Sequence, residues 1–279
     1  MNHVCDSPDP IDPAVLLART GLATFEHHAA VGSTMERARE LAQDADCPLP
    51  AAVVADTQSL GRGQRGARWW QAPGSLAVSV VVDAKSDAQA KPDAQAAAMP
   101  APPAIWSLAC GVALAESLAA VAPTVEPLVR WPNDIEANGR KLAGILVEAT
   151  SGGRAIFGIG VNTTGSCGDA PPPLDKKIVT VPDLTGSPLP RERLLVDFLP
   201  RLFALLVATV LDPEAFVARY RARCGLDGHP ITVFRGDERL TGLCRGIAAD
   251  GTLVLDTSSG RVHVTSGSLT HPADIWRGA

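Results

Sequence analysis

The dipeptide Asn138-Gly139 constrains the fold of this chain more than any other feature, because strand-like runs flank it on both sides. A type I′ turn requires positive φ at both central residues, and Asn-Gly adopts that conformation readily. The sequence therefore predicts an antiparallel hairpin with Asn133 and Asp134 on one strand and Lys141 on its partner. We expect this hairpin to belong to a meander of three strands, at residues 129–135, 141–149 and 155–162.

Local patterns predict further helices and strands around this meander. Ser33 and Glu36 fit a capping box, with serine at the N-cap and glutamate at N3, and predict a helix that runs through residues 39–42. Residues 105–121 are apolar on nearly all sides, as expected of a buried helix. The remaining predictions are strands at 51–56 and 75–82, helices at 191–210 and 213–223, a loop at 57–68, a flexible surface insertion at 83–104 and a proline-rich loop at 166–190.

A smaller unit is expected after the dipeptide Cys224-Gly225. Short strand-like runs follow, and they are separated by Arg235-Gly236-Asp237, Asp250-Gly251 and Ser259-Gly260. Short strands with turn signals at this spacing predict a small β-barrel. The length of 279 residues suits one large domain followed by such a small one.

Composition limits the class of protein. The chain is 46% hydrophobic with a net charge of −5, so it is globular and can bury a sizeable core. Its six cysteines are widely spaced without a C-x-x-C pair, which argues against a structural zinc site and a disulfide framework. The sequence has no apolar run of about 20 residues and no secretory leader, so we expect a cytoplasmic protein without a membrane span. The acidic balance disfavours bulk nucleic-acid binding.

The stretch from Gly61 to Trp70 indicates an anion-binding loop. Three glycines are interspersed with three arginines, and two tryptophans follow. Glycine lets a backbone approach a ligand closely, and arginine offers rigid donor forks that suit phosphate and carboxylate. The spacing is neither the G-x-x-x-x-G-K-[ST] pattern of nucleotide-binding P-loops nor the G-x-G-x-x-G pattern of dinucleotide-binding folds.

This loop and four other motifs occur in an order that resembles the biotin protein ligases. The motifs are Gly32-Ser33-Thr34, Gln58 before the loop, Arg130-Trp131-Pro132-Asn133-Asp134 with the hairpin after it, and residues 158–162. The resemblance runs from about residue 30 to residue 268. It implies an α+β fold, in which a mixed, largely antiparallel sheet is flanked by helices as in class II synthetases, with a small SH3-like C-terminal barrel. We expect an N-terminal extension at 1–29, a catalytic domain at 30–224 and the small domain at 225–279.

The resemblance also implies an activity. Members of this family join biotin to ATP as biotinyl-5′-AMP, with Mg²⁺ accompanying ATP, and transfer biotin to a lysine of a biotin carboxyl carrier protein or domain. No covalent enzyme intermediate and no metal bound by the protein alone are expected. About thirty residues precede the Ser33-Thr34 motif, too few for a helix-turn-helix repressor domain, so we expect no specific DNA binding. A homodimer is compatible with the family.

Lys141 is the first candidate catalytic residue. Lysine is rare in this chain, and the other four lysines fall in predicted loops. The resemblance implies that Lys141 contacts the biotin carboxylate and the adenylate, and that Arg62 acts with it. The implied biotin-binding residues are Ser33, Thr34, Met35, Gln58, Arg62, Gly63, Gln64, Lys141, Gly144 and Gly158. The implied ATP- or adenylate-binding residues are Arg65, Arg68, Trp69, Asn133, Asp134, Lys141 and Asn162.

Three positions depart from the family pattern. Met35 stands where an asparagine is usual, and Gln64 and Ala67 replace residues of the usual Gly-Arg-Gly-Arg-x-Gly-Arg loop. Arg68 lies one position beyond the last arginine of that pattern. We interpret these changes as affecting retention of the adenylate rather than the class of reaction.

Two other functions remain open at this point. A lipoate or octanoate ligase of the same superfamily would share the lysine-bearing sheet but not this form of the loop. A nucleic-acid-binding protein would use the Arg-Gly loop and the barrel, and would bind with strong salt dependence. Single residues also have structural interpretations: a helix cap for Ser33, a core tryptophan for Trp69, a polar strand end for Asn133 and Asp134, and a solvated strand lysine for Lys141.

Overall fold

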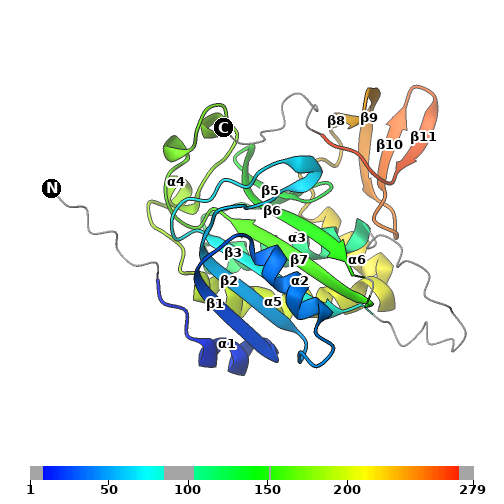
Figure 1. Ribbon diagram of the computed structural model, residues 1–279. Helices are drawn as coiled ribbons and strands as arrows, with labels where there is room; N and C mark the ends of the chain where they lie inside the picture. The colour runs from blue at the N-terminus through cyan, green and yellow to red at the C-terminus, as the bar shows by residue number, and fades with distance from the viewer. Residues whose placement is uncertain (1–8, 85–103, 151, 270–279) are drawn as a thin grey trace, which may run out of the picture.

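A seven-stranded mixed sheet is the centre of the computed structural model, which describes residues 9–84, 104–150 and 152–269. The strand order is β1-β2-β3-β7-β6-β5-β4, and only β1 and β2 are parallel neighbours (Figure 1). This architecture confirms the predicted α+β fold. Most of the insertion expected at 83–104 lies outside the described residues. The strands are β1 Thr24–Val31, β2 Ala51–Gln58, β3 Leu76–Asp83, β4 Leu128–Arg130, β5 Asp134–Ala137, β6 Arg140–Ala149 and β7 Arg154–Val161.

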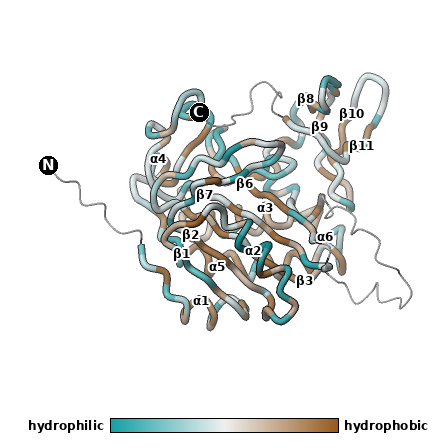
Figure 2. The backbone as a smooth tube through the Cα atoms, viewed as in Figure 1, coloured by the Kyte–Doolittle hydropathy of each residue, from teal (hydrophilic) through white to brown (hydrophobic). Residues whose placement is uncertain are grey.

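Helices cover both faces of this sheet. On one face, α2 (Thr34–Gln43) packs against β2, β3 and β7. On the other face, α3 (Ala104–Val121) and α5 (Arg191–Leu211) pack against each other, and Figure 2 shows many apolar residues, coloured brown, in the central strands and in these helices. Two shorter helices, α1 (Pro13–Thr20) and α6 (Pro213–Arg221), contact α5. The predicted helix at 105–121 is confirmed.

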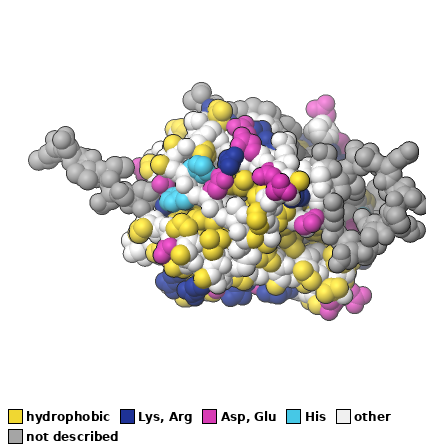
Figure 3. Space-filling view, turned by 60° about the horizontal axis from the view of Figure 1, so that its bottom comes forward, with side chains coloured by type: hydrophobic (Ala, Val, Ile, Leu, Met, Phe, Trp, Pro, Cys, Tyr) yellow, Lys and Arg dark blue, Asp and Glu magenta, His cyan; other side chains and the backbone are white. Residues whose placement is uncertain are grey.

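Among the described residues, α5 alone is long and apolar enough to cross a membrane by length and composition. Its side chains Leu194, Phe198 and Leu202 are fully buried in the core of this fold. A core helix passes the same test of length and composition. In Figure 3, which turns the lower side of the molecule forward, charged side chains of both signs are intermixed with apolar ones.

The hairpin forms at Asn138-Gly139, where φ is +51° and +70°. The strand expected at 129–135 is instead two strands, because β4 ends at Arg130 and β5 begins at Asp134. Arg130 pairs with Asp134 across this tight turn. Asn133 therefore lies in the turn and not on the strand, which corrects the prediction. Pro132 precedes it and cannot donate a hydrogen bond to a strand ladder.

The predicted capping box at the start of α2 is wrong in its hydrogen bonds, although Ser33 does occupy the N-cap position. The Ser33 side chain makes no capping hydrogen bond. The backbone N–H of Thr34 donates instead to Gln58 Oε1, at 2.9 Å. The Glu36 carboxylate pairs with Arg62 rather than with the N-cap backbone. A side chain distant in sequence therefore accepts from the first N–H of this helix, and the glutamate expected to close the capping box is engaged by the loop.

The predicted loops contain short helical segments. The loop at 57–68 holds a 3-10 turn at Gln64–Gly66, and β2 extends into it as far as Gln58. The proline-rich loop holds α4 (Val181–Thr185) and two 3-10 turns, Cys167–Asp169 and Leu174–Lys176.

The C-terminal part forms a separate four-stranded antiparallel sheet with the order β11-β10-β9-β8. Its turns contain Gly236, Gly251 and Gly260, all with positive φ, as the turn signals predicted. At the other end of the chain, residue 30, where we expected the catalytic domain to begin, lies inside β1. The C-terminal strands are β8 Pro230–Arg235, β9 Glu238–Ile247, β10 Leu253–Thr257 and β11 Gly260–Val264.

Candidate ligand site

A cavity of about 660 Å³ lies where the glycine–arginine loop, the start of α2 and the hairpin meet. Nearly all predicted site residues line it, although they come from segments as far apart as residue 33 and residue 162. The side chain of Arg65 is not among the described ones. The predicted residues in the lining are Ser33, Thr34, Met35, Gln58, Arg62, Gly63, Gln64, Arg68, Trp69, Asn133, Asp134, Lys141, Gly144, Gly158 and Asn162.

Lys141 is positioned by a carboxylate and an aromatic ring. Its Nζ lies 2.6 Å from Asp134 Oδ1 and 5.8 Å from the centroid of the Trp69 ring. The backbone of Lys141 is fixed as well, since its N–H donates to the carbonyl of Lys177 (2.9 Å) and its carbonyl accepts from Val179 (3.0 Å). The lysine therefore presents a single positive charge on a rigid strand.

Glycines on β6 and β7 form the floor of the cavity. A Cβ atom at Gly158 would lie 2.6 Å from Met35 Sδ, and one at Gly160 would overlap the indole ring of Trp69. At Gly144 a Cβ would approach Lys141 Cε to 3.0 Å. Met35 and Trp69 thus pack directly on the sheet, and the ring of Trp69 lines the cavity.

Polar groups at the start of α2 form a connected set. Gln58 Oε1 accepts hydrogen bonds from the backbone N–H (2.9 Å) and the hydroxyl (3.1 Å) of Thr34. The hydroxyl of Ser79 in turn donates to Thr34 Oγ1, at 2.8 Å. Ser33 Oγ is buried and has no hydrogen-bond partner among the described residues. Because buried polar groups are normally paired, this hydroxyl is open to a polar ligand.

The glycine–arginine loop is closed on itself by its backbone. The N–H of Gly63 donates to the Ala67 carbonyl (2.8 Å), and the N–H of Trp69 donates to the Gly61 carbonyl (3.0 Å). Arg68 donates from Nη2 to the Ser59 carbonyl at 2.9 Å. These bonds fix the shape of the loop, which lines the cavity.

The two predicted asparagines support the backbone around Lys141. Asn133 Nδ2 donates to the Ile145 carbonyl at 2.7 Å. Asn162 Nδ2 donates to the Val179 carbonyl at 3.0 Å, while its Oδ1 is buried and has no partner among the described residues. Asn162 therefore has one group that holds the loop after β7 and one group that can receive a ligand donor.

Several residues of the lining were missed by sequence reasoning. Gly160 follows Gly158 with strand spacing, which is a signal that could have found it. Arg130 and Glu136 flank the turn of Asn133 and pair with each other. The other missed residues include Lys176 and Lys177 of the loop after β7, Phe234 of β8, and Gly267, Ser268 and Leu269 after β11.

The described residues contain no group of three or more His, Cys, Asp or Glu side chains that could hold a metal ion. The cavity lining offers two carboxylates, Asp134 and Glu136, on the same strand β5. Two carboxylates fit a Mg²⁺ ion that enters with a phosphate ligand, because Mg²⁺ is usually bound by one or two carboxylates plus substrate phosphates.

Comparisons with known proteins agree on one family. Residues 29–163 match the model of the biotin/lipoate A/B protein ligase family, and residues 228–269 match the biotin protein ligase C terminal domain. The biotin--[acetyl-CoA-carboxylase] ligase of Paracoccus denitrificans is 32% identical over 75% of this chain and 85% of its own length. The enzyme of the same name from Mycobacterium tuberculosis is 30% identical over 78% of each chain.

A solved structure shows the same fold. The biotin protein ligase from Aquifex aeolicus, in complex with biotin and ATP, superposes with a TM-score of 0.74 and 23% identity, over 88% of this chain and 97% of that one. A structure of the Helicobacter pylori enzyme, described as biotin acetyl coenzyme A carboxylase synthetase with bound biotinylated ATP, gives a TM-score of 0.58 at 18% identity, over 86% of this chain and 99% of that one.

Proposed function

This chain belongs to the biotin protein ligases, and we propose that its cavity activates biotin with ATP and passes the biotinyl group to a lysine of a carrier domain. The observation that carries the proposal is the position of Lys141. It is a strand lysine whose backbone N–H and carbonyl are both hydrogen-bonded, and its ammonium is held against Asp134 and Trp69 inside a cavity that also contains open polar groups.

Activation brings the biotin carboxylate and the triphosphate of ATP together, and these two anions repel each other. The positive charge of Lys141 reduces this repulsion. The biotin carboxylate replaces Asp134 as the partner of Nζ, and the same ammonium group then faces the α-phosphate of ATP. A carboxylate oxygen forms a bond to the α-phosphorus, and the bond from that phosphorus to the bridging oxygen breaks and releases pyrophosphate. Hydrogen-bond donors that are fixed in place and point at the charge developing in the transition state usually make the largest single contribution to catalysis.

The apolar floor and the polar set at the start of α2 suit the biotin ring. Its ureido group needs donors and acceptors, and Ser33 Oγ is the open hydroxyl of the described lining. Thr34 and Gln58 are already hydrogen-bonded to each other, and they fix the backbone next to Ser33. Met35 stands where the family has asparagine, and it supplies an apolar contact over Gly158 rather than an amide.

The glycine–arginine loop covers the ligand from the other side. We propose that Arg62, Gly63 and Gln64 contact biotin, and that Arg65, Arg68 and Trp69 contact the adenylate. Asp134 would hold Mg²⁺ together with the phosphates of ATP once biotin has taken its place beside Lys141, and Glu136 is the second carboxylate available. Bound Mg²⁺ neutralises phosphate charge. Asn133 and Asn162 keep the strand and loop around Lys141 in place.

In the second step, the amine of the acceptor lysine attacks the carbonyl carbon of biotinyl-5′-AMP. The bond from that carbon to the phosphate oxygen breaks, AMP leaves, and the nitrogen loses a proton as the amide forms. The proposed acceptor is a biotin carboxyl carrier protein or domain of a biotin-dependent carboxylase. The relatives named above carry acetyl-CoA carboxylase in their names, which supports this class of acceptor.

We propose a catalytic unit that ends at residue 224 and a small unit that begins at residue 225; the catalytic unit begins before the expected residue 30, because α1 and β1 belong to it. The five described cysteines are free thiols, which supports a reducing, cytoplasmic location.

Mass spectrometry of a carrier domain tests the proposed function. The protein is incubated with MgATP, the carrier domain and biotin, lipoate or octanoate in separate reactions. We expect a biotinyl adduct on one lysine and neither of the other adducts. A lipoyl or octanoyl adduct without a biotinyl one would favour the other branch of the superfamily, which the biotin ligase relatives do not favour.

A further inference from the structure

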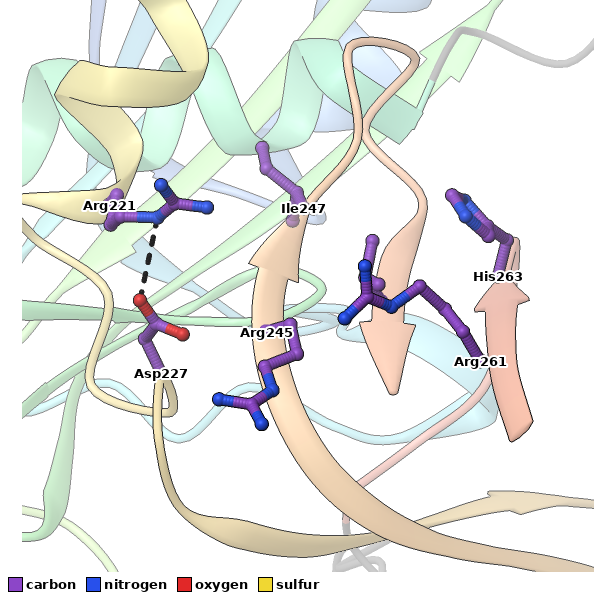
Figure 4. Close-up of a pocket in the computed structure, with 7 residues that line it drawn as sticks. Arg221, Asp227, Arg245, Ile247, Arg261 and His263 are labelled. Atoms are coloured by element: carbon purple, nitrogen blue, oxygen red, sulfur yellow. Dashed lines mark ion pairs between the residues drawn. The ribbon is translucent and has the colours of Figure 1, made fainter. Parts of the chain in front are cut away.

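A second cavity, of about 520 Å³, lies between α6 and one face of the C-terminal sheet. Three arginines from three separate elements converge on it (Figure 4). Arg221 is the last residue of α6, Arg245 is on β9, and Arg261 is on β11. None of them lines the cavity that contains Lys141.

The register of the sheet explains why these arginines meet. Arg261 lies opposite Asp256 on the neighbouring strand β10, and their side chains therefore share one face. Arg245 reaches the same carboxylate from β9 on the other side. Asp256 accepts from Arg245 Nε at 2.7 Å and from Arg261 Nε at 2.8 Å. These two bonds hold the pKa of the Asp256 carboxyl at about 2, so it is ionised at neutral pH.

Asp256 orients the two guanidinium groups without using all their donors. A guanidinium has five N–H groups, and the Asp256 carboxylate accepts from the Nε–H group of each arginine. One Nη atom of Arg261 also contacts Asp256, at 3.2 Å. The remaining N–H groups of Arg245 and Arg261 can bind a ligand.

Arg221 completes the arrangement from the catalytic unit. Its guanidinium lies over the backbone of Gly246, where a Cβ atom would be 3.7 Å from Arg221 Nε. Gly246 has positive φ and no side chain that could separate Arg221 from the sheet. Its partner Asp227 is 3.5 Å away, a long contact for an ion pair. The three arginines are about half exposed, at 58%, 47% and 61%, so an incoming ligand reaches them from solvent.

The rest of the lining suits the body of a small molecule. Ile247 and Val254 provide an apolar surface, and His263 provides a flat ring. The volume is in the range of small-ligand sites, which is about 300–1,000 Å³. Three guanidinium groups offer more N–H donors than the carboxylates of Asp256 and Asp227 accept here, and the oxygens of a phosphate or diphosphate match the remaining donors.

We infer that this cavity is a binding site for a phosphate-bearing small molecule of nucleotide size, distinct from the site of Lys141. The three arginines bind the phosphate oxygens, and the body of the ligand lies over Ile247 and Val254. Because Arg221 belongs to α6 and the other two arginines belong to the C-terminal sheet, the bound anion joins the two units.

Titration calorimetry with inorganic tripolyphosphate tests the site. The samples are the wild-type protein, the double variant R245Q/R261Q, the single variant R235Q and the single variant K141A. Arg235 is an exposed arginine of the same sheet that pairs with Glu238 and does not line this cavity, so R235Q is the control for losing an arginine elsewhere on the sheet. Losing a well-formed charge-assisted hydrogen bond weakens binding about tenfold or more.

The expected result is that R245Q/R261Q weakens binding by at least about tenfold, whereas R235Q and K141A bind as the wild type does. Biotin transfer by the double variant should stay near the wild-type rate, which shows that it is folded. Equal binding by the double variant, absence of binding to the wild type, or loss of binding in K141A would each overturn the inference. The last outcome would mean that the probe occupies only the cavity of Lys141.

Discussion

The Glu36 carboxylate, in the first turn of α2, pairs with the guanidinium of Arg62 in the glycine–arginine loop. In the proposed function Arg62 contacts the ligand. In the protein without ligand, the positive charge of Arg62 is therefore paired with the Glu36 carboxylate. Biotin must compete with this ion pair when it binds Arg62.

Removing the charge of Glu36 should favour biotin binding. Both partners are more than 40% exposed (43% and 44%), so the pair contributes at most about 1 kcal/mol. We expect Glu36→Gln to tighten biotin binding by up to about fivefold, as measured by tryptophan fluorescence titration. Glu40→Gln, which removes a carboxylate that pairs with Arg37 on the same helix, should have no effect. Weaker binding in Glu36→Gln would mean that this carboxylate helps to place the loop.

The contact of Trp69 with Gly160 should be essential for the shape of the cavity. A methyl group at position 160 overlaps the indole ring and displaces it. Overpacking of this kind costs about 1–3 kcal/mol. We expect Gly160→Ala to weaken binding of biotin and ATP at least about fivefold, since about 1 kcal/mol is a factor of about five and about 1.4 kcal/mol a factor of ten. In Gly168→Ala the added methyl would meet no heavy atom closer than 3.7 Å, so this control should bind normally. Normal affinity in Gly160→Ala would remove Trp69 from the ligand site.

Asp183 should make the loop after β7 sensitive to acid. Burial raises the pKa of its carboxyl, but hydrogen bonds from the backbone N–H groups of Cys167 and Thr180 outweigh burial and lower the pKa to about 2. The folded-state pKa is depressed, so the stabilisation is complete above the unfolded-state value near 4 and disappears as pH falls toward 2. Asp183 is exposed, and solvent screening limits the contribution to about 1 kcal/mol.

Urea unfolding of the wild type and Asp183→Asn at several pH values measures this contribution. The difference in unfolding free energy should be present at pH 6 and vanish near pH 2. Asp237→Asn, a change at an exposed turn of the C-terminal sheet, serves as the control and should show no such trend. A difference that stays constant with pH would show that the loop does not depend on the charge of Asp183.

Sequence reasoning succeeded where the signal is local or where a motif recurs. The turn at Asn138-Gly139 depends only on two residues with positive φ, and the buried helix α3 depends only on its own apolar composition. The predicted site residues come from ordered motifs, and the fold brings nearly all of them to one cavity, while their roles toward ligand stay predictions. These features need no knowledge of the tertiary structure.

The failures concern contacts between distant segments. The predicted capping box needs Glu36 to turn back to the N-cap backbone, but this carboxylate pairs with Arg62 of a loop that is distant in sequence. The placement of Asn133 in a turn depends on the pairing of Arg130 with Asp134. The part that the C-terminal sheet takes in the cavity, through Phe234, depends on how the two units pack. No pattern of spacing along the chain contains this information.

Biotin-dependent release of pyrophosphate is the most direct measurement of the central claim, that Lys141 activates biotin in this cavity. It is measured at saturating biotin and MgATP for the wild type, Lys141→Ala and Arg140→Ala, with thermal unfolding as a check on folding. Arg140 is the preceding residue on β6 and does not line the cavity, so its substitution removes one positive charge next to the site. We predict that Lys141→Ala lowers the rate at least ~10²-fold, the scale of losing one preorganised donor, and that Arg140→Ala stays near the wild-type rate. A rate near that of the wild type in folded Lys141→Ala would contradict the account.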